Sequence, residues 1–293
     1  MTKSGIIAII GRPNVGKSTL LNALVGQKIS ITSPKPQTTR LQIWGIKTLD
    51  DAQIVYIDTP GIHRDRNQAM NRYMNRVADS AINDVDIIVF MIDASTWHSE
   101  DELVLEKLKK SNKPVILLIN KIDLLNNKSE VLPIINRVKD RFAFLHIIPV
   151  SAFNRDNILA LQNEIISLLP EGPFLFPEDQ ITDKSLAFQC AEIVREKLMR
   201  TTSEELPYAT AVSIERIKQE EKFMTINALI WVERPGQKAI IIGKNGEKLK
   251  AIGIEARRDI EKIVKQKVLL RLWVKVKRAW SESDASLKKL GYE

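Results

Sequence analysis

Apolar runs and amphipathic stretches alternate along the first 170 residues of the chain. Five short runs are nearly continuous in apolar character, at residues 5–10, 53–58, 86–93, 114–120 and 146–151. Strands buried on both faces of a parallel sheet have this character. Amphipathic stretches such as residues 101–110 and 157–168 separate the runs and predict helices. The alternation predicts a doubly wound α/β domain, in which ligands bind beyond the carboxyl ends of the strands.

A proline-rich stretch then interrupts this pattern. Residues 169–181 contain three prolines and a glycine, a composition typical of a connection between domains. We therefore expect a first domain at residues 1–170, a linker at residues 171–181, and a smaller second domain at residues 182–293 that includes a C-terminal tail.

The second domain has a different order of elements. Asp183 is placed to cap a helix that runs to about residue 200, and two alternating stretches, residues 208–217 and 223–232, predict strands. An apolar segment, a G-x-x-G loop, a helix and a third strand follow at residues 240–242, 243–246, 247–265 and 267–278. This order resembles an α+β KH domain of type II, whose loop clamps about four nucleotides of a single strand. A plain turn between two helices is the other interpretation of the loop.

The loop after the first predicted strand carries the complete G-x-x-x-x-G-K-[ST] pattern. Its residues are Gly11, Arg12, Pro13, Asn14, Val15, Gly16, Lys17 and Ser18, with Thr19 next in the chain. Glycines let the backbone turn its N–H groups inward, where the helix N-terminus also attracts phosphate. We expect Lys17 to reach the β- and γ-phosphates and Ser18 to bind Mg²⁺.

A D-x-x-G element follows the second predicted strand and consists of Asp58, Thr59, Pro60 and Gly61. Asp58 is expected to hold Mg²⁺ through water, and the Gly61 N–H to bond the γ-phosphate. The next residue is Ile62, whose side chain cannot hydrogen-bond the attacking water. Intrinsic hydrolysis of the nucleotide is therefore expected to be slow, or to depend on another group that positions the water.

A proline-containing loop before that element is the second candidate switch segment. It includes Gln37, Thr38 and Thr39, and its lack of apolar periodicity predicts a surface position. One threonine hydroxyl there would complete the Mg²⁺ shell, with Thr39 the first choice and Thr38 the second.

Two short motifs predict recognition of guanine. Asn120, Lys121 and Asp123 follow the fourth predicted strand, and Ser151 and Ala152 follow the fifth. The Asp123 carboxylate can accept both the N1–H and the N2 amine of guanine, an edge that adenine does not offer. A base that leaves such a buried hydrogen-bonding group unpaired binds much more weakly, so guanine and adenine should be strongly discriminated.

The charge distribution predicts the kind of partner, and the cysteine content predicts the cellular compartment. Residues 1–183 hold 21 basic and 21 acidic side chains, whereas residues 184–293 hold 23 and 15. The excess predicts a polyanionic partner for the second domain, either nucleic acid or an anionic membrane surface. A single cysteine, Cys190, fits a reducing cytosol, and no apolar run has the length of a secretory signal or membrane span.

Taken together, the motifs resemble the TrmE–Era group of bacterial P-loop GTPases, in the members that carry a KH domain. The resemblance covers the whole chain and includes the segments at residues 37–40, 253–257, 272–277 and 290–292. It implies GTP and GDP as ligands with Mg²⁺, and K⁺ held beside the phosphates by the asparagine at position 14. It further implies binding to the 3′ end of 16S rRNA, action in assembly of the 30S ribosomal subunit, and cytoplasmic location with peripheral association with the inner membrane. We expect a monomer.

The predicted RNA-contacting residues surround the G-x-x-G loop and extend to the third strand. They are Ile242, Gly243, Lys244, Asn245, Gly246, Lys248, Arg257, Trp273, Lys275 and Lys277. A solvated strand face is the alternative for the last three. Two other functions remain open, a metabolic phosphotransferase and a membrane-associated GTPase whose basic domain binds anionic lipid. The guanine motif argues against the first, and the G-x-x-G loop argues against the second.

Overall fold

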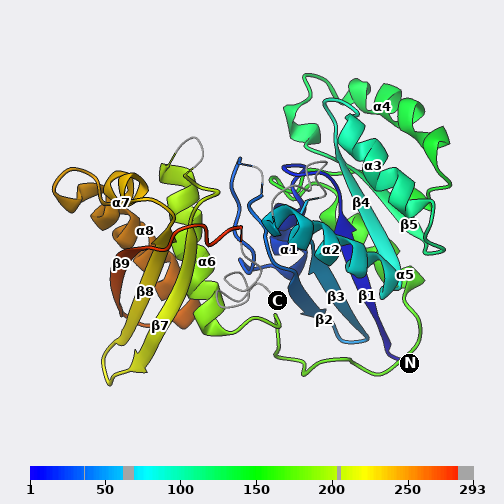
Figure 1. Cartoon of the computed structure of the whole chain (residues 1–293). Helices are drawn as coiled ribbons and strands as arrows, with labels where there is room; N and C mark the ends of the chain where they lie inside the picture. The colour runs from blue at the N-terminus through cyan, green and yellow to red at the C-terminus, as the bar shows by residue number, and fades with distance from the viewer. Residues whose placement is uncertain (36, 62–68, 203–205, 283–293) are drawn as a thin grey trace. The chain divides into compact units, whose positions relative to one another are not determined.

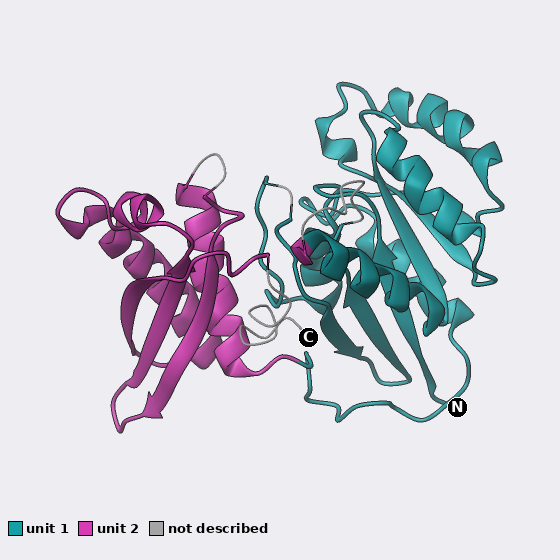
Figure 2. Ribbon diagram, in the orientation of Figure 1, with its two compact units in different colours: residues 1–67, 71–183 teal, residues 68–70, 184–293 magenta. Residues whose placement is uncertain are grey.

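The chain folds into two compact units, which Figure 1 shows as ribbons coloured along the sequence and Figure 2 shows in two colours. The computed structural model describes residues 1–35, 37–61, 69–202 and 206–282. The first unit comprises Met1–Asn67 and Asn71–Asp183, and the second comprises Gln68–Met70 and Lys184–Glu293. Ile62, assigned above to a switch segment, lies outside the described residues.

The first unit is built on a six-stranded sheet in the order β2-β3-β1-β4-β5-β6. The strands are β1 (Lys3–Ile10), β2 (Ile43–Thr48), β3 (Ala52–Asp58), β4 (Ile87–Asp93), β5 (Val115–Asn120) and β6 (His146–Pro149). All neighbours are parallel except β2 and β3, which are antiparallel. Every residue of β3, β4 and β5 is buried, which explains their continuous apolar character.

Helices cover both faces of this sheet (Figure 1). They are α1 (Lys17–Val25), α2 (Ala69–Asn83), α3 (Ser99–Leu108), α4 (Val131–Val138) and α5 (Ile158–Leu168), with short 3₁₀ turns at Ile122–Leu124, Lys128–Glu130 and Lys139–Arg141. α2, α3 and α4 share one apolar cluster with β1, β3, β4 and β5. α1 and α5 contact each other on the opposite face. The doubly wound fold is confirmed, with an added antiparallel edge strand, β2.

The proline-rich segment after α5 is tied to the sheet of the first unit. The N–H groups of Leu175 and Phe176 both donate to Gln53 Oε1, at 2.7 and 2.9 Å. Asp183 Oδ1 accepts the N–H of Trp44 at 3.0 Å, so the prediction that Asp183 caps a helix is wrong. Ser185 caps that helix instead, since its hydroxyl oxygen accepts the Phe188 N–H at 3.2 Å.

The second unit packs three helices on one face of a three-stranded sheet. Its elements are α6 (Leu186–Thr201), β7 (Ala211–Gln219), β8 (Met224–Val232), α7 (Pro235–Ile242), a 3₁₀ turn (Lys244–Gly246), α8 (Glu247–Val264) and β9 (Val268–Val276). The strand order is β7-β8-β9, with β7 antiparallel and β9 parallel to β8. Alternate residues of the strands join the helices in one apolar core. The KH-type order of elements is therefore confirmed.

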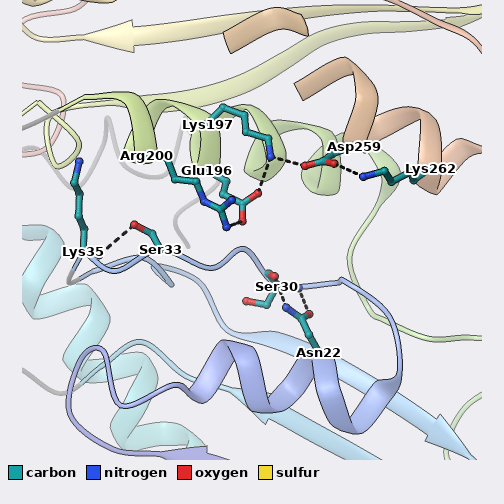
Figure 3. Close-up of polar contacts among 9 residues, drawn as sticks. All are labelled: Asn22, Ser30, Ser33, Lys35, Glu196, Lys197, Arg200, Asp259 and Lys262. Atoms are coloured by element: carbon teal, nitrogen blue, oxygen red, sulfur yellow. Dashed lines mark hydrogen bonds and ion pairs between the residues drawn. The ribbon is translucent and has the colours of Figure 1, made fainter. Parts of the chain in front are cut away.

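An ion-pair network joins α6 to α8 within the second unit (Figure 3). The Lys197 ammonium binds the Asp259 carboxylate, and Lys262 on the next turn of α8 binds the same carboxylate at 2.8 Å. On α6, Arg200 donates to Glu196 Oε1 at 2.9 Å, one helical turn away. The Lys197–Asp259 pair therefore links α6 to α8, which pack against each other.

Candidate functional site

The phosphate-binding pattern forms the turn between β1 and α1, at the carboxyl edge of the sheet. Gly16 has φ 106°, in the left-handed region that favours glycine. A Cβ atom at Gly16 would lie 2.3 Å from Asn120 Nδ2. That amide nitrogen donates to the Val15 carbonyl at 2.7 Å. Glycine therefore lets this loop pack directly against the asparagine of the guanine motif.

Lys17 is the buried cation of this loop. Its Nζ donates to the carbonyl oxygens of Gly11 and Arg12, at 3.0 and 2.9 Å. Burial lowers the pKa of Lys17 to about 8, although the nearby Asp58 carboxylate opposes the shift. An anionic phosphate beside this ammonium would favour its charged form.

A cluster of hydroxyl groups surrounds Asp58 at the end of β3. Asp58 Oδ2 accepts hydrogen bonds from Ser18 at 2.7 Å, Ser30 at 3.0 Å and Thr39 at 3.2 Å. The Ser18 and Thr39 hydroxyl oxygens lie 2.6 Å apart. The structure thus brings together the three residues predicted to hold Mg²⁺. The hydroxyl of Thr38, the second choice, donates to the Lys35 carbonyl instead, at 2.7 Å.

The other Asp58 oxygen shows how well this cluster fits a cation. Oδ1 is buried and has no hydrogen-bond partner among the described residues. Burial raises the pKa of Asp58, against the lowering effects of Lys17 and the three hydroxyls. An unpaired carboxylate oxygen beside two hydroxyl oxygens is a donor set of the kind that Mg²⁺ prefers. The residues present therefore fit the ion.

Ser30 was not identified from the sequence. Asn22 of α1 holds its backbone, since Asn22 Oδ1 accepts the Ser30 N–H at 3.0 Å and Nδ2 donates to the Ser30 carbonyl at 2.8 Å (Figure 3). A serine in a polar loop carries no distinguishing pattern, so only the fold brings its hydroxyl to Asp58.

Two contacts join the switch segments to the phosphate loop. Asn14 has φ 63°, and its Nδ2 donates to the Pro34 carbonyl at 2.9 Å. A Cβ at Gly61 would lie 2.8 Å from the backbone nitrogen of Pro13. The close approach therefore requires glycine, and the backbone of the D-x-x-G element lies against the loop.

The guanine motifs meet at the ends of β5 and β6. Asn120 Oδ1 accepts the Ala152 N–H at 3.0 Å, and the Ser151 hydroxyl donates to Asp123 Oδ1 at 2.5 Å. Lys121 pairs with Asp93 of β4 at 2.7 Å, a contact not predicted from the sequence. Burial would raise the pKa of Asp93, but hydrogen bonds from Lys121 and Ser95 outweigh it and the net shift is downward.

The G-x-x-G loop of the second unit connects α7 to α8. Gly243, Asn245 and Gly246 all have positive φ, at 73°, 52° and 78°. A Cβ at Gly243 would lie 2.7 Å from Lys248 Cβ, so no larger residue fits there without movement. Lys244 and Asn245 are exposed at the tip of the loop.

An apolar groove of about 360 Å³ starts at this loop and runs along β9. Its lining consists of Gly246, Leu249, Lys250, Gly253, Ile254, Arg257, Leu270 and Leu272. Of the residues predicted to contact RNA, only Gly246 and Arg257 line it. Trp273 and Lys275 alternate with the groove-facing residues of β9 and so lie on the opposite face of the sheet. The predicted RNA-contacting residues are therefore divided between the two faces of the sheet.

Comparison with known proteins decides the family. A family model described as 50S ribosome-binding GTPase matches residues 6–121, and one described as KH domain matches residues 205–281. GTPase Era of Coxiella burnetii (strain Dugway 5J108-111) is 52% identical over 292 residues, covering 100% of this chain and 99% of that protein. The chain belongs to the Era family of GTPases. GTPase Era of Haemophilus influenzae (strain PittGG) is also 52% identical over 292 residues, with coverage of 99% and 97%.

Solved Era structures share the fold of the whole chain. Era in complex with MgGDPNP and nucleotides 1506–1542 of 16S ribosomal RNA has a TM-score of 0.97 at 43% identity, covering 100% of this chain and 99% of that one. An Aquifex aeolicus Era variant bound to GDP·AlF₄⁻ has a TM-score of 0.96 at 43% identity, covering 99% of each chain. As an Era-family protein, this chain is a GTPase with a KH domain. Within the described ranges, no helix has the length and apolar character to cross a membrane.

Proposed function

We propose that this chain is a GTP-dependent switch that hydrolyses GTP to GDP and phosphate and binds single-stranded ribosomal RNA through its KH domain. The observation that carries the proposal is that the Asp58 hydroxyl cluster includes Ser18, the residue after buried Lys17 in the phosphate loop. The same chain has an apolar groove beside a G-x-x-G loop. Phosphate and cation chemistry belong to the first unit, and nucleic-acid chemistry to the second.

The nucleotide roles follow from the contacts of the first unit. Lys17 and the inward N–H groups of the loop would bind the phosphates, and Asp123 would read the guanine edge. Ser18, Thr39 and Asp58 would hold Mg²⁺, which when bound neutralises charge on the phosphates. The hydroxyls of Ser18 and Thr39 would then exchange their bonds to Asp58 for bonds to the ion. Ordering of the switch segments by GTP is the step that this exchange would control.

Hydrolysis by the purified chain should be slow and should be faster with potassium. Without RNA we expect about 10⁻² s⁻¹ or less, the range of switch GTPases that lack a partner. Asn14 belongs to the phosphate loop and donates from Nδ2 to the Pro34 carbonyl, which leaves its side-chain oxygen to help hold K⁺ beside the phosphates. Turnover measured in KCl should exceed that in NaCl, and Asn14→Ala should abolish the difference. Asn163→Ala, on the exposed side of α5, is the matched control. Equal rates in the two salts would rule out a potassium site.

The RNA partner is proposed from the groove and from the relative whose structure contains 16S rRNA nucleotides 1506–1542. Bases can pack on the apolar lining of the groove, while Arg257, Lys250 and the exposed Lys244 face the sugar-phosphate backbone. We accordingly propose the 3′ region of 16S rRNA as ligand, assembly of the 30S subunit as the process and the cytoplasm as the location.

The combined substitution Lys244→Asp and Asn245→Asp tests this RNA site. Both side chains are exposed, so the fold should survive, while two carboxylates would face the phosphates. We expect the affinity for single-stranded RNA to fall at least about tenfold, and the slope of log K against log salt to decrease by about 1. Lys222→Asp, in the hairpin between β7 and β8, is the charge control and should have little effect. If the folded double variant kept its RNA affinity, the G-x-x-G loop would be a turn between two helices that does not bind RNA.

A further inference from the structure

On the face of the KH sheet that points away from α6, α7 and α8, polar, basic and aromatic side chains form rows across the three strands. The strand register aligns Arg216, Asn227 and Arg271 in one row across the sheet. The next two rows toward the other end are Ser213, Leu229 and Trp273, and then Ala211, Trp231 and Lys275. No described helix of the second unit packs on these rows, which we call the outer face, although Ala211 and Leu229 within them are buried.

Two tryptophans and one unpaired polar atom distinguish the outer face. The Trp273 side chain is 42% exposed, so part of its ring is open to a ligand. Beside it, Lys275 Nζ lies 5.9 Å from the ring centroid of Trp231. In the row with two exposed arginines, Asn227 Oδ1 is buried without a hydrogen-bond partner in the described part of the chain.

The charge of the outer face is positive. Arg216, Lys218, Arg271 and Lys275 are exposed on it. Two of these cations pair with acidic side chains, Lys275 with Glu215 at 3.6 Å and Lys218 with Glu220 at 3.1 Å. An exposed ring for base stacking and cations for the phosphates are the combination with which proteins bind single-stranded nucleic acid. A lipid surface would attract the same cations, and the vesicle measurement below separates it from RNA.

We propose that the outer face is a second surface for single-stranded RNA, which takes nucleotides continuing from those held in the groove. The inference rests on the RNA-binding function proposed above. Bases would stack on Trp273, with Arg271 and Lys275 close to the phosphates.

The position of β9 makes a continuous path available. β9 is the edge strand of the sheet, and its alternate residues serve the two surfaces. Leu270 and Leu272 line the groove, whereas Arg271 and Trp273 lie on the outer face. A G-x-x-G groove holds about four nucleotides, far fewer than the RNA of nucleotides 1506–1542 in the related complex. An RNA strand that leaves the groove can therefore cross the free edge of β9 onto Trp273.

Two RNA lengths distinguish the surfaces in the full chain. One probe is the 16S fragment of nucleotides 1506–1542, and the other is a single strand of about eight nucleotides from its 3′ part, enough for the groove. Trp273→Ala should weaken the long probe about tenfold or more and change the short probe less than twofold. Trp273→Phe, which keeps an aromatic ring, should restore most of the affinity. Lys222→Gln, exposed in the hairpin between β7 and β8, is the control.

Each outcome decides the inference. The second RNA surface would be ruled out if folded Trp273→Ala bound the long probe as tightly as wild type, or if it lost the same affinity for both probes. It would also be ruled out if Trp273→Ala kept its RNA affinity but no longer bound anionic vesicles. The variant that combines Lys244→Asp and Asn245→Asp tests the groove separately from the outer face. If that variant bound both probes as tightly as wild type, the groove proposal would fail, whatever Trp273→Ala shows.

Discussion

Replacing Asp123 by asparagine should change the preferred nucleotide from GTP to xanthosine triphosphate. The aspartate carboxylate accepts from N1–H and the N2 amine of guanine, whereas an asparagine amide can donate to the oxygen that xanthine carries at C2. Discrimination by a matched buried edge is worth about 10⁴-fold, so the ratio of the two affinities should change by that order. Competition of the two triphosphates against a fluorescent GDP analogue measures it.

The controls separate base reading from folding. Ser151 donates to Asp123 at 2.5 Å, and an asparagine oxygen can still accept that bond, so the loop should keep its conformation. Asp140→Asn, at an exposed site in the same unit, should leave both affinities unchanged. If Asp123→Asn kept the wild-type affinity for GTP, Asp123 would not belong to the base site.

Replacing Lys17 by methionine should have the second large effect. Truncation of a buried, hydrogen-bonded charge that pairs with a ligand costs about 2–5 kcal/mol, which corresponds to a loss of GTP affinity of about 30-fold to several thousand-fold. Titration calorimetry with GTP and GDP measures the loss. Lys109→Ala, an exposed lysine on α3's C-terminal side, should retain wild-type affinity.

The same variant separates binding from stability. The pKa of Lys17 is lowered to about 8 by burial, so keeping the ammonium charged in the nucleotide-free fold costs stability at neutral pH. Methionine removes that cost and should raise the thermal midpoint of the nucleotide-free chain. A large drop in that midpoint would instead assign Lys17 a structural role.

The pH dependence of nucleotide affinity follows from the same shift. Above about pH 8 the free protein loses the Lys17 proton, whereas phosphate favours the charged ammonium. Binding then requires proton uptake, and GTP affinity should fall by up to about tenfold per pH unit. Lys17→Met should show no such slope from this group. A wild-type affinity that is flat from pH 8 to 9.5 would contradict the assignment.

The sequence predicted the elements whose pattern is continuous and local. The buried parallel strands and the phosphate loop are of this kind, because burial on both faces of a strand and the turn before α1 each leave a complete signature. β2 was not predicted, since Gly45 interrupts a short edge strand whose pairing depends on β3. Its antiparallel register becomes visible only when the sheet is assembled.

Contacts between distant segments could not be predicted in the same way. Ser30 joins Asp58 across 28 positions of the chain, and the pairing of Lys121 with Asp93 depends on β4 and β5 lying side by side. A strand at residues 267–278 was predicted, but the sequence did not show which of its faces meets the groove. The structure places Leu270 and Leu272 at the groove, and Trp273 and Lys275 on the opposite face of the sheet.

The central claim is that one chain combines a guanine-nucleotide switch with a KH domain whose ligand is RNA. A competition assay tests it most directly. The full chain, loaded with a non-hydrolysable GTP analogue and Mg²⁺, is bound to the fluorescent 16S fragment of nucleotides 1506–1542, and anionic phospholipid vesicles or unlabelled RNA are added. We predict that unlabelled RNA releases the label while vesicles in excess leave it bound. Release of the label by vesicles at comparable concentrations, or failure of the chain to bind the fragment, would contradict the account.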